Sequence, residues 1–428
     1  MSSTSYLSRS VTPSTATSWT VSFWFKVTNI NPSSGTPYLW SCGSSSGGHG
    51  IYYNNPTDVL RYYGHTGYTD AALSSGVLRD TNAWYHCVLS VNAGTGTSYI
   101  NGVQQGSTIS SMGPLNAHTG NLMAVNAYVG GLSTYDDGGF LMSHFHFIDG
   151  TAYPASTFGE TDSTTGQWKI KTNVSVTYGT NGFFLFKDNA SANDQSGNSN
   201  NFTATGTITN TEDCPSNVFA TWNAIKKVNT VALSNGNTTA SGNADDGVWG
   251  TIGDNQGKWY WETQNNENNT VVGIASEDVT QATGRSENTG VYGLQNGTTY
   301  AYYRNNGSSG QSSGFPQTTT SNTVCHALDL DNGKYFVGVD GVFKNLSGTT
   351  SNLGTGADPT FTGLDTTKFW FPFTECRGTG AGCDANFGNG YFGTTAISSE
   401  GTNASGIGKF EYDVPAGYTA LSTKGLNE

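Results

Sequence analysis

Short runs in which apolar and polar residues alternate recur along the whole chain. In the run Trp19–Val27, every odd-numbered position holds Trp, Val or Phe, whereas the even-numbered positions hold Thr, Ser and Lys together with Trp24. A period of two places successive side chains on opposite faces of an extended strand. The run therefore predicts a half-buried β-strand.

Similar runs predict strands in both halves of the chain, and short turn motifs separate them. Asn101-Gly102, Asn332-Gly333 and Asp340-Gly341 each follow such a run, and these dipeptides favour the positive φ angles of tight hairpins. No amphipathic helix of useful length interrupts the pattern. We therefore expect an all-β protein built from antiparallel β-sandwiches. The predicted strands cover residues 84–91, 98–103, 128–131, 140–148 and 182–186, then 257–262, 271–275, 299–303, 324–330, 334–339 and 342–343.

The length and one polar stretch indicate two domains. The chain has 428 residues, which is more than one compact core usually supports. The strand pattern lapses between residues 205 and 218, where the chain is polar and contains Pro215. We place the boundary there and expect two tandem β-sandwich domains, residues 1–212 and residues 213–428.

The charge and the hydropathy exclude several classes of partner. The formal net charge is −13 and only 11% of residues are charged, whereas nucleic-acid binding relies on clustered Lys and Arg. No apolar stretch approaches the ~20 residues that span a bilayer. The N-terminus lacks the basic and apolar regions of a signal peptide, so we expect synthesis in a cytoplasm, with no nucleic-acid partner and no insertion into a membrane.

The six cysteines are scattered, and none of them forms a C-x-x-C motif, so the sequence does not support a zinc site or a thioredoxin-like site. Cys376 and Cys383 flank a Gly-rich segment and could close a loop in an oxidising medium. Synthesis in a reducing compartment favours free thiols instead.

Two groups of aromatic residues are candidate binding sites, because aromatic faces stack on sugar rings and neighbouring Asn or Asp side chains bind hydroxyl groups. The alternative is that half of each alternating pair belongs to the core. In the first half the candidates lie in a stretch rich in Gly and Asn. In the second half they are followed by an Arg and by the Gly-rich segment 307–314, which we predict to be a loop. The candidates are Tyr52, Tyr53, Tyr62, Tyr63 and Tyr68 in the first half, and Tyr302, Tyr303 and Arg304 in the second.

Metal binding and catalysis receive weaker support from the sequence. Asp136 and Asp137 form an acidic turn that could contribute to a calcium site, but two adjacent Asp residues supply only part of a calcium shell, and turn chemistry explains them equally well. His144 and His146 lie two residues apart on a predicted strand and could begin a metal site, but no third metal ligand is evident nearby. Retaining glycosidases need two carboxylates about 5–5.5 Å apart. Glu160 and Asp162 are the nearest candidates, but no third acid follows them, and Glu267 lies too far from Glu262 to share one face of a short strand. We therefore expect no enzyme and no cofactor, with calcium at Asp136 and Asp137 as the alternative.

Several motifs in the first half are specific when taken together. On these motifs the first half resembles the laminin-G-like, concanavalin-A-type (jelly-roll) domains of bacteriophage structural proteins, marine and cyanophage-like ones especially. One departure is His144, where relatives often carry an acidic residue. The motifs are Ser5 to Ser10, Trp84-Tyr85-His86, Phe147-Ile148-Asp149-Gly150, Pro154, Phe158-Gly159-Glu160, Gly166-Gln167-Trp168 and Tyr178 to Phe183.

The second half resembles a SPRY domain, and the two resemblances together cover nearly the whole chain. The motifs are residues 257–262, 272–274, 291–293, 328–334, 371–372, 386–388 and 410–418.

These resemblances imply binding, since laminin-G-like domains hold glycans or proteins and SPRY domains hold protein partners through loops. They imply a virion-surface protein that is assembled in the host cytoplasm and contacts other virion proteins. As part of a fibre or tail, it would bind a glycan or protein on the host surface. A homo-oligomer, such as a trimer, would agree with the assemblies that are usual among phage fibre proteins. The alternatives are a capsid or tail decoration protein without receptor binding and a glycan-active hydrolase.

Overall fold

The computed structural model describes residues 5–28, 36–44, 47–64, 69–115, 121–130, 139–188, 191–228, 231–243, 245–280, 288–296 and 301–427. The chain divides into two compact units. The first unit comprises Met1–Asn210 with Cys214–Ser216, and the second comprises Thr211–Asp213 with Asn217–Glu428. Both units consist of strands, turns and short 3-10 segments in their described parts, so the all-β prediction is confirmed. Within the described residues, no helix has the length and apolarity needed to cross a lipid bilayer.

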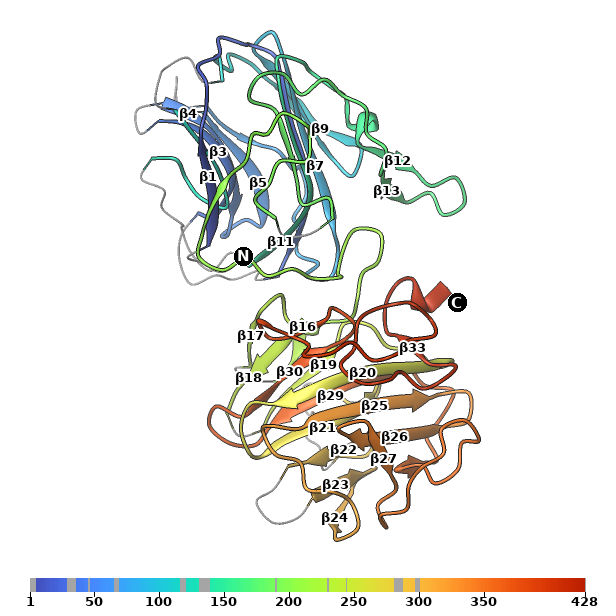
Figure 1. Cartoon of the computed structure of the whole chain (residues 1–428). Helices are drawn as coiled ribbons and strands as arrows, with labels where there is room; N and C mark the ends of the chain where they lie inside the picture. The colour runs from blue at the N-terminus through green and yellow to red at the C-terminus, as the bar shows by residue number, and fades with distance from the viewer. Residues whose placement is uncertain are drawn as a thin grey trace. The chain divides into compact units, whose positions relative to one another are not determined.

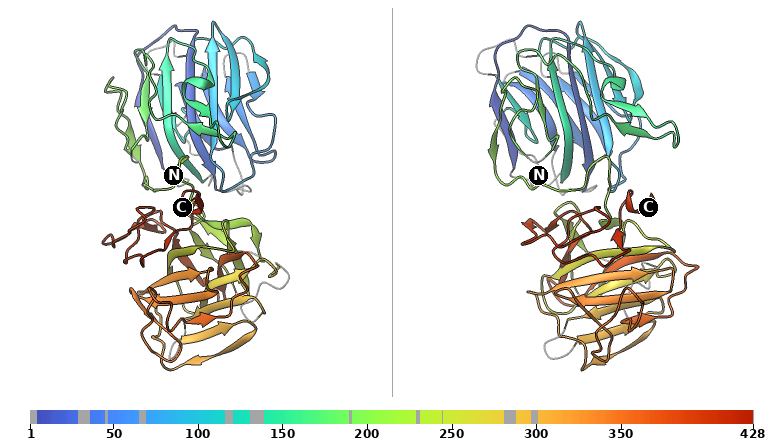
Figure 2. Two further views of the ribbon diagram at one scale, coloured as in Figure 1. Left: turned by 90° about the vertical axis from the view of Figure 1, so that its right-hand side faces the viewer. Right: turned by 45° about the vertical axis from the view of Figure 1, so that its right-hand side comes forward.

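The first unit contains two large antiparallel sheets that face each other (Figures 1 and 2). One has seven strands in the order β15-β1-β10-β3-β4-β5-β6, and the other has six in the order β14-β11-β2-β7-β8-β9. The strands are β1 (Tyr6–Ser10), β2 (Trp19–Val27), β3 (Tyr38–Ser44), β4 (Gly47–Asn54), β5 (Val59–Gly64), β6 (Thr69–Ala72), β7 (Tyr85–Asn92), β8 (Thr95–Ile100), β9 (Val103–Ile109), β10 (Leu122–Val125), β11 (Phe140–Asp149), β14 (Phe183–Leu185) and β15 (Thr203–Thr205).

The core of the first unit is made by the inward faces of both sheets. Trp19 lies 5.7 Å from Trp40 between ring centroids, and Phe23 stacks on Phe145 at 5.0 Å. These apolar side chains are removed from water, which is the main favourable contribution to folding. The alternation in Trp19–Val27 therefore identified the core face of β2 correctly.

The outer face of β2 is buried as well, so the expectation of a half-buried strand was wrong. A small pair of strands, β12 (Gly159–Thr161) and β13 (Trp168–Ile170), belongs to the chain that covers this face. Trp168 donates its indole N–H to Nδ1 of His86 at 3.0 Å, and His86 contacts the Ser22 hydroxyl through Nε2 at 2.9 Å. Since an indole can only donate, Nδ1 of His86 is an acceptor and Nε2 carries the proton.

The second unit is also a sandwich of two large sheets (Figure 1). The seven-stranded sheet has the order β16-β19-β29-β21-β22-β23-β24. Seven strands of the nine-stranded sheet have the order β17-β18-β30-β20-β25-β26-β27, and its other two strands pair off this path. The strands are β16 (Trp222–Lys227), β17 (Ala232–Ser234), β18 (Thr239–Ser241), β19 (Asp246–Gly250), β20 (Lys258–Asn265), β21 (Thr270–Ser276), β22 (Val291–Gln295), β23 (Ala301–Asn305), β24 (Ser308–Ser312), β25 (Thr323–Asp329), β26 (Lys334–Val339), β27 (Val342–Lys344), β29 (Trp370–Cys376) and β30 (Gly382–Asn386).

Shorter elements complete the two units. The first unit has the 3-10 segment η1 (Ala155–Thr157). In the second unit, β28 (Phe361–Thr362) pairs with β26, β33 (Thr419–Ala420) pairs in parallel with β20, and β31 (Tyr391–Phe392) pairs with β32 (Thr395–Ala396). The chain closes with η3 (Gly425–Asn427).

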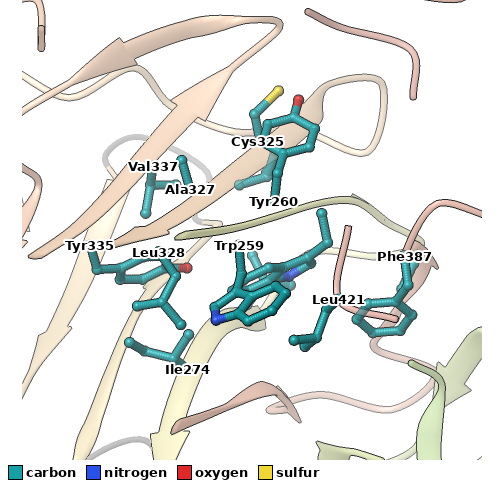
Figure 3. Packing of buried hydrophobic residues seen from close by; sticks show 14 of the residues in the cluster. Trp259, Tyr260, Ile274, Cys325, Ala327, Leu328, Tyr335, Val337, Phe387 and Leu421 are labelled. Carbon is teal, nitrogen blue, oxygen red and sulfur yellow. The ribbon is translucent and has the colours of Figure 1, made fainter. Parts of the chain in front are cut away.

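The core of the second unit is rich in aromatic residues (Figure 3). Trp261 stacks on His326 with ring centroids 4.9 Å apart, and Tyr335 stacks beside Phe361 at 5.7 Å. His326 is fully buried, and its two ring nitrogens contact the hydroxyls of Thr263 and Tyr335. The imidazole is thus satisfied inside the core, as buried polar groups must be.

One strand prediction failed, and of the strands that were not predicted, β29 was missed for an identifiable reason. Residues 128–130 do not form a strand, because Asn126 has a positive φ of 63° and ends β10. The backbone N–H of Val129 then donates to the Ser41 hydroxyl rather than to a neighbouring strand. The sequence also gave no prediction of β29, since Pro372 lies inside it and Pro usually marks the edge of a sheet. Gly250, where β19 ends, lies beside the Pro372 ring and leaves room for it.

Candidate binding face

The strands β4, β5 and β6 lie at one edge of the seven-stranded sheet in the first unit and present two different faces. Ile51, Tyr53, Leu60 and Tyr62 point into the core. Because neighbouring side chains on a strand point to opposite sides, Tyr52, Arg61 and Tyr63 project from the outer face.

A row of tyrosine rings crosses this outer face. Tyr38 lies 5.5 Å from Tyr52 and 4.9 Å from Tyr128 between ring centroids. Gly50 lies under the Tyr38 ring, since a Cβ atom at Gly50 would come within 2.5 Å of it. The missing side chain lets Tyr38 lie against the sheet. Tyr38 and Tyr128 remain partly exposed, whereas Tyr52 is buried, with 7% of its surface exposed.

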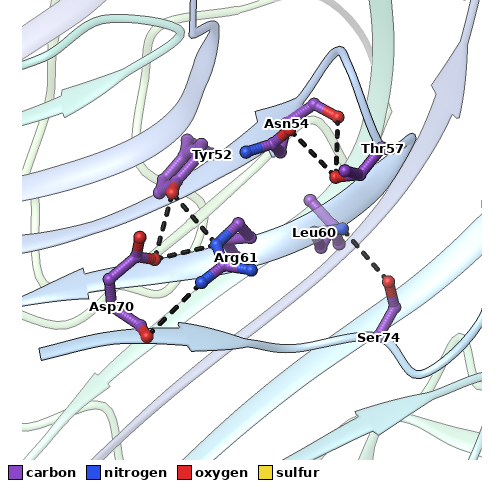
Figure 4. A network of polar contacts seen from close by, with 7 residues as sticks. All are labelled: Tyr52, Asn54, Thr57, Leu60, Arg61, Asp70 and Ser74. Atoms are coloured by element: carbon purple, nitrogen blue, oxygen red, sulfur yellow. Dashed lines mark hydrogen bonds and ion pairs between the residues drawn. The ribbon is translucent and has the colours of Figure 1, made fainter.

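The row ends in a polar network on β4, β5 and β6 (Figure 4). The Tyr52 hydroxyl donates to Oδ1 of Asp70 at 3.0 Å, and Nε of Arg61 donates to the same oxygen at 2.9 Å and to the Tyr52 hydroxyl at 3.1 Å. Burial, together with the Asp70 carboxylate, raises the pKa of Tyr52, so its hydroxyl stays protonated. The hydrogen bond to Asp70 raises the pKa of Arg61, which stays charged.

We call Tyr38, Tyr52, Arg61, Tyr63, Asp70 and Tyr128 the tyrosine face. It combines aromatic rings with an ion pair whose side chains remain partly exposed, 27% for Arg61 and 45% for Asp70. Tyr63 is also partly exposed and lies opposite Asp70 in the strand register. Rings of this kind provide a flat apolar surface, and the charged pair provides a donor and an acceptor beside it.

The structure places the five sequence candidates of the first half differently. Tyr52 and Tyr63 belong to the tyrosine face. Tyr53 and Tyr62 are fully buried, where Tyr53 donates to Asp58 and Tyr62 contacts Nδ1 of His49, so the alternative interpretation as core residues applies to them. Tyr68 lies outside the described residues.

The three candidates of the second half do not form one surface. Tyr302 is partly exposed and accepts a hydrogen bond from Gln311 at 3.1 Å. Tyr303 packs against the core, and Arg304 is mostly buried and donates to Oε1 of Gln295. The segment 307–314, which the sequence suggested as a loop, contains the edge strand β24 instead.

The sequence did not identify Tyr38, Arg61, Asp70 or Tyr128 as site residues. The register of β3 to β6 brings Tyr38, Tyr52 and Arg61 into line, and register between distant strands cannot be read from local spacing. One signal was present: Arg61 directly precedes Tyr62-Tyr63, so alternation places it on the same face as Tyr63.

The metal and thiol candidates add no second site. Asp136 and Asp137 lie outside the described residues. In the part of the chain that the structure describes, no three His, Cys, Asp or Glu side chains converge as metal ligands would. Cys376 and Cys383 are free thiols, and burial raises the pKa of Cys376 to about 12.

The candidate acids have structural partners. Glu160 and Asp162 both pair with Lys169, and Asp162 also accepts the backbone N–H groups of Thr164 and Thr165. Those bonds lower the pKa of Asp162. Glu262 is fully buried beneath residues 411 and 412, whose backbone N–H groups it accepts. In these positions the carboxylates stabilise a turn and a packed segment.

Comparison with known proteins supports the concanavalin-type resemblance of the first unit. Residues 2–156 match a laminin-G family model described as the Concanavalin A-like lectin/glucanases superfamily. No curated protein matches the sequence.

Several solved structures resemble part of the chain. The TRIM65 PSpry domain is 13% identical, with 39% of this chain and 91% of that chain covered and a TM-score of 0.30. The SPRY domain of human HERC1 is 14% identical, with 38% and 96% covered and a TM-score of 0.29. A heptameric SAP-like pentraxin from Limulus polyphemus is 19% identical, with 35% and 71% covered and a TM-score of 0.28. Likenesses at these identities and TM-scores do not bear on function.

Proposed function

We propose that the chain is a non-enzymatic recognition protein whose first unit binds a glycan through the tyrosine face, and that it is displayed on the surface of a bacteriophage particle. The observation that carries the proposal is the row formed by the partly exposed rings of Tyr128 and Tyr38, which the buried Tyr52 connects to the Arg61–Asp70 pair. Sugar rings present apolar C–H faces edged by hydroxyl groups, and this row offers a matching surface. The match of residues 2–156 to a lectin and glucanase superfamily agrees with glycan binding.

The non-enzymatic part of the proposal rests on the carboxylates. Glu160 and Asp162 share Lys169, and Glu262 is buried under the C-terminal segment. A glycosidase needs one carboxylic acid and one carboxylate on either side of an accessible bond. Incubation with host polysaccharide should therefore release no fragments, and measurable release of reducing ends would contradict a pure binding role.

Glycan binding is tested with the whole chain on a panel of polysaccharides that includes envelope glycans of the host. Replacing Tyr38 or Tyr128 by Ala removes stacking surface from the row, and we expect a loss of affinity of about tenfold, or 1.4 kcal/mol. Tyr302→Ala is the matched control, since Tyr302 is a partly exposed tyrosine in the second unit.

Three results would change the proposal. Wild-type protein that binds no glycan in the panel would overturn glycan recognition. Unchanged affinity in both Tyr38→Ala and Tyr128→Ala would remove the tyrosine face as the site. A loss in Tyr302→Ala alone would transfer the site to the second unit.

The location on a particle is a separate step that rests on the motif resemblance of the first half. Antibodies against the chain should label intact phage particles in electron micrographs and reduce their adsorption to host cells. Labelling without any effect on adsorption would favour the alternative of a capsid or tail decoration protein. Absence of the chain from purified particles would contradict both roles.

A further inference from the structure

Two histidines of the first unit are buried beneath residues 151–178, which we call the cover. His86 on β7 and His146 on β11 lie on the outer face of the six-stranded sheet and are 1% and 2% exposed. His86 stacks on Trp24 at 4.7 Å between ring centroids, and His146 stacks on Phe184 at 3.9 Å. Both imidazoles are thus enclosed by apolar side chains. The buried members of the apolar cluster that joins the cover to the sheet are Val88, Ile148, Ala155 and Phe158.

Both histidines contact the cover through Nδ1. The indole N–H of Trp168 donates to Nδ1 of His86 at 3.0 Å, and the Tyr178 hydroxyl contacts Nδ1 of His146 at 2.8 Å. An indole can only donate, so the bond from Trp168 exists only while Nδ1 of His86 carries no proton. A proton at that atom would turn two N–H groups toward each other. The closed cover therefore requires a neutral His86.

The charges of the neighbouring strands do not compensate a positive charge on either ring. Among the described residues, neither His86 nor His146 forms an ion pair with a carboxylate. His144 on β11 is the nearest titratable neighbour, and its protonated form would repel a charge on both rings. Burial lowers the pKa of His144 to about 4, while Asp188 raises it and Lys187 lowers it.

The other charged and titratable groups around the two rings supply no counterion either. Lys26 on the outer face of β2 is itself a cation. Burial raises the pKa of Tyr178, so its hydroxyl stays neutral. In the cover, Lys169 pairs with Glu160 at 3.6 Å and with Asp162 at 3.1 Å, and these three side chains are partly exposed. Their charges are therefore balanced within the cover.

We propose that the cover is operated by acid: His86 and His146 take up protons when the cover lifts, so acidification opens residues 151–178 and exposes the apolar cluster beneath them. In the closed state both rings are neutral and shielded from water. In the open state both rings reach water, and a proton on His86 no longer meets the indole N–H. The device does not depend on glycan binding by the tyrosine face, which lies on the other sheet of the unit.

The direction of the pH effect follows from the burial of the two rings. Burial lowers the pKa of His86 to about 3, with a smaller contribution from His144, and burial lowers the pKa of His146 well below its usual value. An exposed histidine titrates at about 6.5. Closure is therefore fully stable above about pH 6.5 and weakens as the pH falls below it. Each ring that becomes exposed raises the opening equilibrium by up to about tenfold per pH unit.

Hydrogen exchange measured by mass spectrometry on the whole chain tests the device at pH 7 and pH 4.5, after the pH dependence of the chemical exchange step is divided out. The reporters are two amides of the cover: the Tyr153 N–H donates to the Thr20 hydroxyl at 2.8 Å, and the Lys171 N–H donates to the Phe158 carbonyl oxygen at 3.0 Å. We expect protection in the cover to fall at least about tenfold at pH 4.5, while β2 keeps its protection. Unchanged protection of the cover, or its loss together with that of β2, would overturn the proposal.

The double variant His86→Asn with His146→Asn removes both titratable rings and keeps a polar atom near the position of each Nδ1. Each protein is compared with itself at the two pH values, so a less stable cover at pH 7 does not obscure the result. We expect protection in the cover of the double variant to change less than about twofold between the two pH values. Each single variant should lose part of the response.

His49→Asn is the matched control. His49 is 4% exposed, and its Nδ1 contacts the Tyr62 hydroxyl inside the core of the same unit rather than beneath the cover. This variant should keep the acid response of the cover. A full acid response in the double variant would overturn the assigned role of His86 and His146. Loss of the response in His49→Asn would also overturn it, because the response would then belong to the unit as a whole.

Discussion

The side-chain amide of Asn181 donates to Oδ2 of Asp149 at 2.8 Å, and both side chains are buried. Asn181 also bridges to the backbone of Thr12 through both of its amide atoms. This joins the Asp149-Gly150 end of one sequence motif to the Tyr178 to Phe183 motif. Gly179 is required where the two motifs meet, since a Cβ there would lie 1.9 Å from the Asp149 carbonyl oxygen. The most specific motifs of the first half are therefore structural.

Asn181→Ala should destabilise the first unit by about 2–3 kcal/mol, because it removes one donor from the buried Asp149 carboxylate and leaves the N–H and the carbonyl oxygen of Thr12 without their partner. Asn193→Ala, an exposed residue in the same unit, should change stability by less than about 0.5 kcal/mol. Hydrogen exchange measured by mass spectrometry on peptides of the first unit locates the effect. Equal protection in the two variants would show that the Asn181 contacts contribute nothing.

Glu262 holds the C-terminal segment to the outer side of β20. Its carboxylate accepts the backbone N–H groups of Glu411 at 2.9 Å and Tyr412 at 2.8 Å, the Tyr260 hydroxyl at 2.9 Å and the amide of Asn386 at 3.3 Å. Burial raises the pKa of Glu262 to about 7, against the effect of these donors. The folded protein therefore binds a proton that the unfolded chain, with an ordinary Glu pKa, does not bind between about pH 4.5 and 7.

The contribution of Glu262 to stability should consequently rise as the pH falls from above 7 towards 4.5. Glu262→Gln should remove this component and lower stability by about 1–3 kcal/mol, because the Gln amide nitrogen cannot accept the N–H groups of residues 411 and 412. The measurement is the difference in unfolding free energy between wild type and variant at several pH values. Glu267→Gln, at a carboxylate outside this contact, is the control. A difference that does not vary between pH 4.5 and 7.5 would contradict the assigned titration.

His326 has the opposite dependence on pH. Burial between Trp261 and Tyr335 lowers the pKa of His326 to about 3, so between about pH 3 and 6.5 the unfolded chain binds a proton that the folded protein does not. Its contribution to stability is present above pH 6.5 and falls on acidification, by up to about 1.4 kcal/mol per pH unit. His326→Gln should be less stable at pH 7 but should lose less on going to pH 4. Parallel stability curves for variant and wild type would contradict this.

Local pattern predicted β2, β7, β8, β11, β14, β20, β21, β25 and β26, but not β3 to β6, and not how the strands meet. Asn101-Gly102 has the positive φ angles of 48° and 77° that its sequence predicted, because a two-residue turn is determined by the residues inside it. The tyrosine face could not be assembled in this way, since Tyr38 and Asp70 come together only through three successive strand pairings. The burial of Tyr53 and Tyr62 was left open for a related reason: alternation shows two faces without saying which one is covered.

Gly273 on β21 and Gly293 on β22 lie opposite each other in the seven-stranded sheet of the second unit. A Cβ atom at Gly273 would come within 2.1 Å of the Tyr292 carbonyl oxygen and 2.6 Å of Cα of Gly293. Both contacts are with backbone, which cannot move aside as a flexible side chain would. Gly273→Ala should therefore separate the two strands and cost about 3 kcal/mol or more.

Gly354→Ala is the matched control for this change, since only one atom, in the Asn352 side chain, lies within 4 Å of its added Cβ, at 3.5 Å. That variant should be neutral or slightly more stable, because Ala restricts the unfolded chain more than Gly does. Chemical denaturation of both proteins measures the difference, and hydrogen exchange in residues 291–295 shows whether β22 has loosened. A Gly273→Ala protein as stable as Gly354→Ala would mean that the close approach of β21 and β22 is not required by the fold.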